Sequence, residues 1–111
     1  MASSQKTVDY ITEQIAAAGL ITSRKMFAEY ALYCNGKVIG FVCDDSLFIK
    51  PTNEGKAFLP EAKYAPAYPG GKMYLLIPEE KWEDRDFMVK LTTLTADALP
   101  LPKPKKIKKL Y

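Results

Sequence analysis

Histidine is absent from this chain of 111 residues, and its absence removes several kinds of chemistry. Without it there is no Ser/His/Asp or Cys/His nucleophile system and no histidine-ligated metal site. The two cysteines, Cys34 and Cys43, cannot supply a four-cysteine zinc site. We therefore expect no enzymatic activity, no catalytic residues, no metal and no cofactor.

The cysteines are also badly placed for a disulfide. In the hairpin predicted below, Cys43 lies about six residues, or about 20 Å, along its strand from the residue opposite Cys34. A disulfide needs Cα atoms within about 7 Å of each other. We predict two free thiols that act as small buried hydrophobes.

Long apolar runs are lacking as well. No stretch reaches the roughly 18 apolar residues that a membrane span requires. Residues 1–9 are polar and do not contain the apolar core of a secretory signal. We expect a cytoplasmic protein with no membrane partner.

What the chain does contain is typical of one globular domain with a basic end. Its apolar share is 48% and its charged share 26%, both ordinary values. The net charge is +3, but acidic residues slightly outnumber basic ones outside the last stretch. We predict a domain over residues 1–99 and a flexible tail, rich in proline and lysine, over residues 100–111.

The tail carries the candidate nucleic-acid contacts. These are Lys103, Lys105, Lys106, Lys108 and Lys109, with no acid among them. Such lysines could neutralise phosphates and give salt-dependent, sequence-independent binding. We favour a solvated, solubilising terminus, because prolines interleaved with the lysines prevent a basic helix.

Two amphipathic helices are predicted at the ends of the domain. In the first, over 4–18, apolar residues at Val8, Ile11 and Ile15 have helical spacing. Ser3 or Ser4 can cap its start, and Gly19 suits a left-handed turn at its end. In the last helix, which starts after an N-cap at Asp84, one face should hold Phe87, Leu91, Leu94 and Ala98.

Between these helices the pattern is that of strands. Segments 24–34 and 37–43 are rich in aromatic and β-branched residues, and Asn35-Gly36 between them favours a type I′ hairpin turn. With Cys34 opposite Lys37, the register would pair Leu32 with Ile39 and Tyr30 with Phe41. A third strand over 46–50, a short helix over 52–59, a loop or edge strand over 64–68 and a strand over 72–77 follow. Both sheet faces are apolar, so each should be at least partly covered by helix or partner.

Clustered strands predict an α+β fold: two layers, with an antiparallel sheet of about four or five strands and the N- and C-terminal helices packed on it. The adjacent basic residues Arg24 and Lys25 are interpreted as marking a sheet edge. The carboxylates in the predicted turns and helix starts have a local structural use there, so we do not assign them to catalysis or metal binding.

Several of these segments together resemble a known family, the N-terminal domain of the TfoX/Sxy competence regulators. The resemblance rests on Arg24-Lys25-Met26-Phe27, Tyr30-Ala31-Leu32-Tyr33, Gly36, the run from Phe41 to Lys50, and Met73 to Pro78. The matching motif residues are Arg24, Met26, Phe27, Tyr33, Gly36, Lys50 and Pro78. Ala28 and Glu29 depart from the pattern, because family members often carry glycine there.

The resemblance implies a bacterial-type regulator of transcription. Longer family members have a further helical domain and act as co-regulators of competence genes beside a global transcription activator; we expect a one-domain version here. The expected function is a non-enzymatic regulatory or interaction module, and the expected partner is another protein, with a second copy of the chain as one candidate. The alternative is a weak, sequence-nonspecific nucleic-acid binder that uses the tail.

Overall fold

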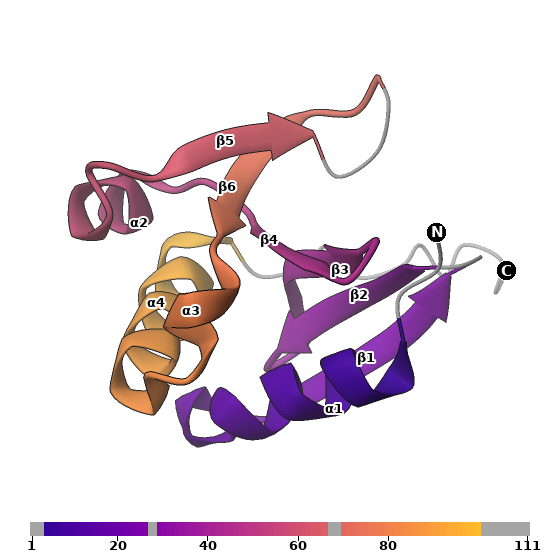
Figure 1. Cartoon of the computed structure of the whole chain (residues 1–111). Helices are drawn as coiled ribbons and strands as arrows, with labels where there is room; N and C mark the ends of the chain where they lie inside the picture. The colour runs from indigo at the N-terminus through magenta and orange to yellow at the C-terminus, as the bar shows by residue number, and fades with distance from the viewer. Residues whose placement is uncertain (1–3, 27–28, 67–69, 101–111) are drawn as a thin grey trace, which may run out of the picture.

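The computed structural model describes residues 4–26, 29–66 and 70–100, so Phe27 and the five tail lysines lie outside the described residues. Six antiparallel strands form one sheet in the order β1-β2-β3-β4-β6-β5, and helices pack on it in an α+β fold (Figure 1). The elements are α1 (Gln5–Gln14), the 3₁₀ turn η1 (Ala16–Ala18), β1 (Ile21–Met26), β2 (Glu29–Cys34), β3 (Lys37–Cys43), β4 (Ser46–Ile49), α2 (Asn53–Phe58), β5 (Lys63–Pro66), β6 (Met73–Ile77), α3 (Glu79–Trp82) and α4 (Arg85–Ala98).

The sheet has six strands where the sequence predicted four or five. The predicted strand over 24–34 is in fact two strands, since β1 and β2 pair antiparallel with Met26 opposite Glu29. The sequence between these two residues contains no glycine, proline, asparagine or aspartate, the residues that usually signal a turn. The segment over 64–68, predicted as a loop or edge strand, supplies β5, an edge strand.

The β2–β3 hairpin has the predicted turn. Asn35 has φ 52° and Gly36 has φ 84°, as a type I′ turn requires, and Cys34 lies opposite Lys37. The Asp44-Asp45 turn that follows also has positive φ at both residues. Asparagine and aspartate tolerate a positive φ because their side chains can form hydrogen bonds with the nearby backbone.

Beyond the turn the predicted register is wrong, because β3 contains a bulge. Tyr33 lies opposite Val38, but Leu32 lies opposite Gly40, so Ile39 is the extra residue. The predicted pairs Leu32–Ile39 and Tyr30–Phe41 are replaced by Leu32–Gly40, Ala31–Phe41 and Tyr30–Val42. The one-residue shift reverses the alternation of faces, so Val42 joins the helix-covered core and Phe41 moves to the other face.

Helix α1 presents the predicted residues to the core. The Ser4 side chain accepts a hydrogen bond from the Thr7 backbone N–H, which caps the helix, and Val8, Ile11 and Ile15 are all buried. Gly19 does not form the predicted left-handed turn, since its φ is 156° and its ψ −159°. Its lack of a side chain instead makes room for Asn35, whose Oδ1 accepts a 2.8 Å hydrogen bond from the Leu20 N–H.

Helix α4 starts as predicted but buries a different face. The Asp84 side chain caps it by accepting from the Phe87 N–H, and Leu91 is buried as expected. The other buried residues are Met88, Thr92, Thr95 and Ala96, whereas Phe87 and Leu94 are only partly buried and Ala98 is exposed. The Thr95 hydroxyl donates to the Leu91 carbonyl at 2.8 Å, which lets a polar residue occupy the buried face.

The main core lies between the helices and one face of the sheet, which we call the inner face. Figure 1 shows α1 running along β1 and β2, with α3 and α4 beside it. This core joins residues of α1, α3 and α4 to the inner side chains of strands β2, β3, β4 and β6. Cys34 is part of this cluster, whereas Cys43 belongs to a second one, and both are free thiols, as predicted.

Candidate functional site

The opposite, outer face of the sheet carries a second apolar cluster. Its members are Cys43, Phe48 and Tyr74, with Phe41, Ala65 and Leu76 packed against them. All six come from strands, so within the described residues no helix contributes to this cluster. The aromatic rings of Phe41 and Tyr74 meet edge to face, with their centroids 5.5 Å apart. The outer face therefore carries an apolar surface to which the described helices contribute no side chain.

A groove of about 590 Å³ runs over this face, and we call it the outer groove. Its floor is formed by Ala31, Tyr33, Val38, Phe41 and Tyr74 from strands β2, β3 and β6. Tyr33, Val38 and Phe41 remain partly exposed along it. Partly exposed apolar side chains in a groove are typical of a binding surface.

The charged side chains that line the outer groove are both cationic. They are Lys50, which follows β4, and Lys72, which precedes β6. No carboxylate lies among the lining residues that the structure describes. The Lys50 backbone N–H donates to the Ile39 carbonyl at 2.8 Å, so the bulge fixes this lysine at the groove. The groove thus combines an apolar floor with positive charge.

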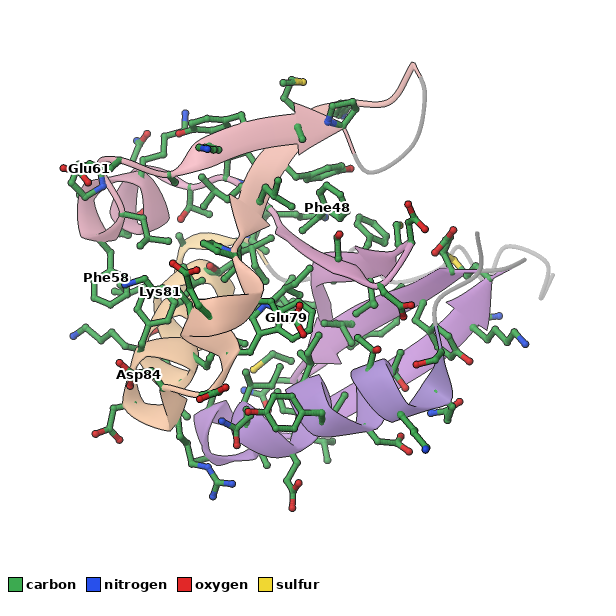
Figure 2. All side chains as sticks on the ribbon, viewed as in Figure 1. Phe48, Phe58, Glu61, Glu79, Lys81 and Asp84 are labelled. Atoms are coloured by element: carbon green, nitrogen blue, oxygen red, sulfur yellow. The ribbon has the colours of Figure 1, made fainter. Side chains whose placement is uncertain are left out.

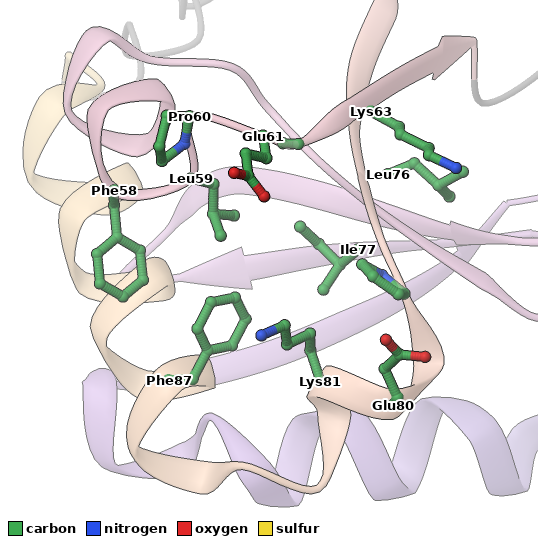
Figure 3. A pocket seen from close by; sticks show the side chains of 12 residues that line it. Phe58, Leu59, Pro60, Glu61, Lys63, Leu76, Ile77, Glu80, Lys81 and Phe87 are labelled. Atoms are coloured by element: carbon green, nitrogen blue, oxygen red, sulfur yellow. The ribbon is translucent and has the colours of Figure 1, made fainter.

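A second cavity of about 680 Å³, the side pocket, lies beside the helices (Figure 3). Figure 3 shows Phe58 of α2 and Phe87 of α4 on one side of it. Their rings stack with centroids 5.4 Å apart, and the Lys81 ammonium lies 5.4 Å from the Phe87 centroid. This cation–π contact holds the lysine over the ring.

The other charged residues of the side pocket are mixed in sign. Glu61 and Lys63 come from the segment after α2 and from β5, and Glu80 comes from α3. Figure 2 labels Glu61, in the segment between α2 and β5, and Lys81, on α3. All of these charged residues are exposed. Catalytic carboxylates are usually buried or placed against another charge, so this arrangement gives no reason to assign acid–base chemistry to the pocket.

The two thiols are also poor nucleophiles. Burial raises the pKa of the Cys43 thiol to about 11, with a further contribution from the Glu29 carboxylate. Burial likewise raises the pKa of Cys34, and the charge of Asp97 adds to the effect. Both thiols therefore stay protonated at neutral pH, whereas reactive cysteines need the thiolate.

Residues 4–26, 29–66 and 70–100 contain no group of three or more His, Cys, Asp or Glu side chains that could hold a metal ion. Over the same ranges, no helix is both long and apolar enough to cross a bilayer.

The structure brings some of the motif residues together and separates others. Met26, Tyr33 and Lys50 all line the outer groove. Arg24 is exposed on the edge strand β1, and Gly36 is in the hairpin turn. Pro78 lines the side pocket instead.

Sequence reasoning did not identify Val38, Phe41, Lys72 and Tyr74 as groove residues. In the structure Tyr74 is buried, whereas Val38 and Phe41 are partly exposed in the groove. The signal that could have found the groove is the apolar character of both strand faces, since the helices at the two ends of the domain cover only one.

The comparisons with known proteins agree with the motif resemblance. The family model described as the TfoX N-terminal domain matches residues 13–99. A relative from Spirochaeta aurantia is 35% identical over 108 residues, which cover 97% of this chain and 93% of that protein. It is described as an uncharacterized 12.7 kDa protein in the trpE 5′ region.

Proposed function

Since the chain belongs to the TfoX N-terminal domain family, we propose that it is a non-enzymatic regulatory module that acts in the cytoplasm by binding another protein. The observation that carries the proposal is the outer groove. Three motif residues gather there, on the sheet face whose apolar cluster is built from strands. An apolar, partly exposed groove is a suitable docking surface for a protein segment.

The chemistry of the described thiols and cavities supports a binding role over an enzymatic one. The buried thiols have raised pKa values, and the charged residues of the side pocket are exposed and mixed in sign. Among the described lining residues of the two cavities there is no serine, threonine or cysteine to act as an activated hydroxyl or thiol nucleophile.

Photo-crosslinking in the native cell tests this function. We would place p-benzoylphenylalanine at Tyr33 in the outer groove and, as a matched control, at the exposed Tyr10 on α1. We expect a nuclease-resistant adduct from position 33 and none from position 10. An adduct of twice the chain mass would identify a second copy as the partner. Equal labelling at both positions would contradict binding through the groove.

Nucleic-acid binding through the tail is the competing function, and the same experiment addresses it. A nuclease-sensitive adduct would favour it. It would also predict binding to duplex DNA that weakens steeply with salt, with a log–log slope of roughly −4 to −5 for five phosphate contacts. Replacement of the five tail lysines by glutamine should then abolish binding, whereas our proposed function predicts no appreciable DNA binding near physiological salt.

A further inference from the structure

The shape of the outer groove limits what can occupy it. The groove is open and about 590 Å³ in volume, and its floor is apolar. The rings of Phe41 and Tyr74 are already engaged edge to face, and Tyr74 is only 8% exposed. Bases stack on open aromatic faces, and Tyr33 is the one described ring of the floor outside this pair, so the floor is better suited to aliphatic side chains than to a run of stacked nucleobases.

Two methionines add adaptable contacts to the groove. Met26 at the end of β1 is 38% exposed, and Met73 at the start of β6 is 51% exposed, and both line the groove. Methionine side chains are flexible and polarizable, and proteins use them where a surface must fit peptide side chains of varied shape.

The positive charge of the groove discriminates between acidic and basic peptides. Lys50 and Lys72 line the groove without a carboxylate beside them, and no hydrogen bond or ion pair of either side chain is seen with the described residues. The carboxylates of Glu29 and Asp44 lie near Cys43, outside the lining. An acidic segment would pair with both lysines, whereas a basic one would be repelled.

The charge argument also disfavours the chain's own tail as the occupant. Leu99 lines the groove, and the segment with five lysines and no acid begins four residues later at Lys103. Its charge has the same sign as Lys50 and Lys72, so its entry into the groove would bring like charges together.

We propose that the outer groove binds an acidic peptide segment of a partner protein, with aliphatic side chains on the floor and carboxylates paired to Lys50 and Lys72. This assignment rests on the proposed function and specifies the chemistry of its partner. The lysines contribute mainly orientation and selectivity, and the apolar floor contributes most of the affinity.

Fluorescence anisotropy with the full-length chain tests the assignment. The probe is a short fluorescein-labelled peptide of alternating leucine and glutamate, and its control has lysine in place of glutamate. We expect the acidic peptide to bind and the basic one not to bind. The double variant Lys50→Glu/Lys72→Glu should weaken binding by at least about tenfold, because two attractive contacts become repulsive. The matched variant Lys56→Glu/Lys90→Glu reverses two exposed lysines outside the groove and should stay within about twofold.

Four results would overturn the proposal. The first three are equal binding of the two peptides, equal effects of the two double variants, and tighter binding of a labelled oligothymidine that is lost in Lys50→Glu/Lys72→Glu. Absence of any peptide binding to the native chain would also overturn it, as expected if the tail fills the groove. If an adduct still forms at position 33 in the photo-crosslinking experiment, only the chemistry assigned to the partner is wrong and the proposed function stands.

Discussion

At Gln14 a single buried amide joins three helices. Its Nε2 donates to the Trp82 carbonyl oxygen at 2.7 Å, and its Oε1 accepts from the Nε and Nη2 atoms of Arg85 at 3.2 and 3.0 Å. These bonds fix the end of α1 against α3 and the start of α4. They also explain why a polar residue is buried beside an apolar stripe.

Gln14→Ala should therefore lower the free energy of unfolding by about 1–3 kcal/mol, because the buried Trp82 carbonyl loses its donor. Its neighbour Glu13 is exposed on the same helix. Glu13→Ala should change stability by less than about 0.5 kcal/mol, as for other surface positions. Urea unfolding followed by circular dichroism measures the stability of both variants. Equal losses of unfolding free energy would mean that the hydrogen bonds of Gln14 contribute nothing to stability.

Gly40 is the residue opposite Leu32 at the bulge, and a Cβ at this position would overlap the Phe48 backbone oxygen. The strands can approach this closely only because the side chain is missing. Gly40→Ala should destabilise the protein by about 1–3 kcal/mol, as expected for overpacking against backbone.

Gly55 is the control position for the Gly40→Ala variant. It is buried in the first turn of α2, where a Cβ would meet the Thr52 hydroxyl at 3.1 Å and the side chains of Leu75 and Leu91 at 3.7 and 3.9 Å. Alanine has a better helix propensity by about 1 kcal/mol, which offsets the tight contact. The same unfolding experiment should find Gly55→Ala much less destabilising than Gly40→Ala, and the reverse order would contradict the bulge geometry.

At the scale of elements, helix α4 offers a direct test of which face is buried. Leu91→Ala and Met88→Ala should each cost about 2–5 kcal/mol, because both side chains are only 1% exposed. Leu94→Ala should cost clearly less, since Leu94 is only partly buried. Lys90→Ala should change the free energy of unfolding by less than about 0.5 kcal/mol. A larger loss of unfolding free energy in Leu94→Ala than in Met88→Ala would show that the face predicted from the periodicity is the buried one.

The elements differ in how far the sequence could predict them. The caps at Ser4 and Asp84 and the Asn35-Gly36 turn depend on local chemistry, so local patterns identified them. The face of α4 could not be predicted, because Thr92 and Thr95 are buried there while the apolar Leu94 is partly exposed. Tertiary packing outweighs hydrophobic periodicity at such positions.

The bulge and the β1–β2 reversal depend on strand pairing rather than on local residues. An extra residue at Ile39 changes which side chains share a face, and no sequence signal other than Gly40 marks it. The outer groove could not be predicted for the same reason, since Phe41 lines it only in the shifted register. The motif residues Met26, Tyr33 and Lys50 could be named from sequence, but their meeting in one groove could not.

At the scale of the whole molecule, the stability should depend on pH through the buried thiols. The pKa of Cys43 rises from its ordinary 9.0 to about 11 on folding. A raised pKa in the folded state means that the stabilisation is complete below about pH 9 and is lost as the pH rises through about 11, because the unfolded chain releases its thiol proton first.

Urea unfolding at several pH values across this window measures the effect. Cys43→Ala should lower stability at neutral pH, because it removes a buried side chain, but it should also flatten the decline between about pH 9 and 11. If the free energy of unfolding fell as steeply with pH in Cys43→Ala as in the native chain, Cys43 would not titrate as its burial implies. The raised pKa of Cys34 supplies part of the slope that remains.

The strand order has a consequence for how the chain is made. Apart from β4 beside β6, every neighbouring pair in the sheet joins strands that follow one another in sequence. During translation, β1 to β4 can pair as soon as Ile49 has left the ribosome, with α1 already present to cover part of their inner face. Helix α4, which packs on β3 and η1, is synthesised after the other helices and strands of the described residues. We expect the nascent chain to keep an uncovered apolar patch until that helix emerges, so stalled or shortened translation products should be the forms that aggregate.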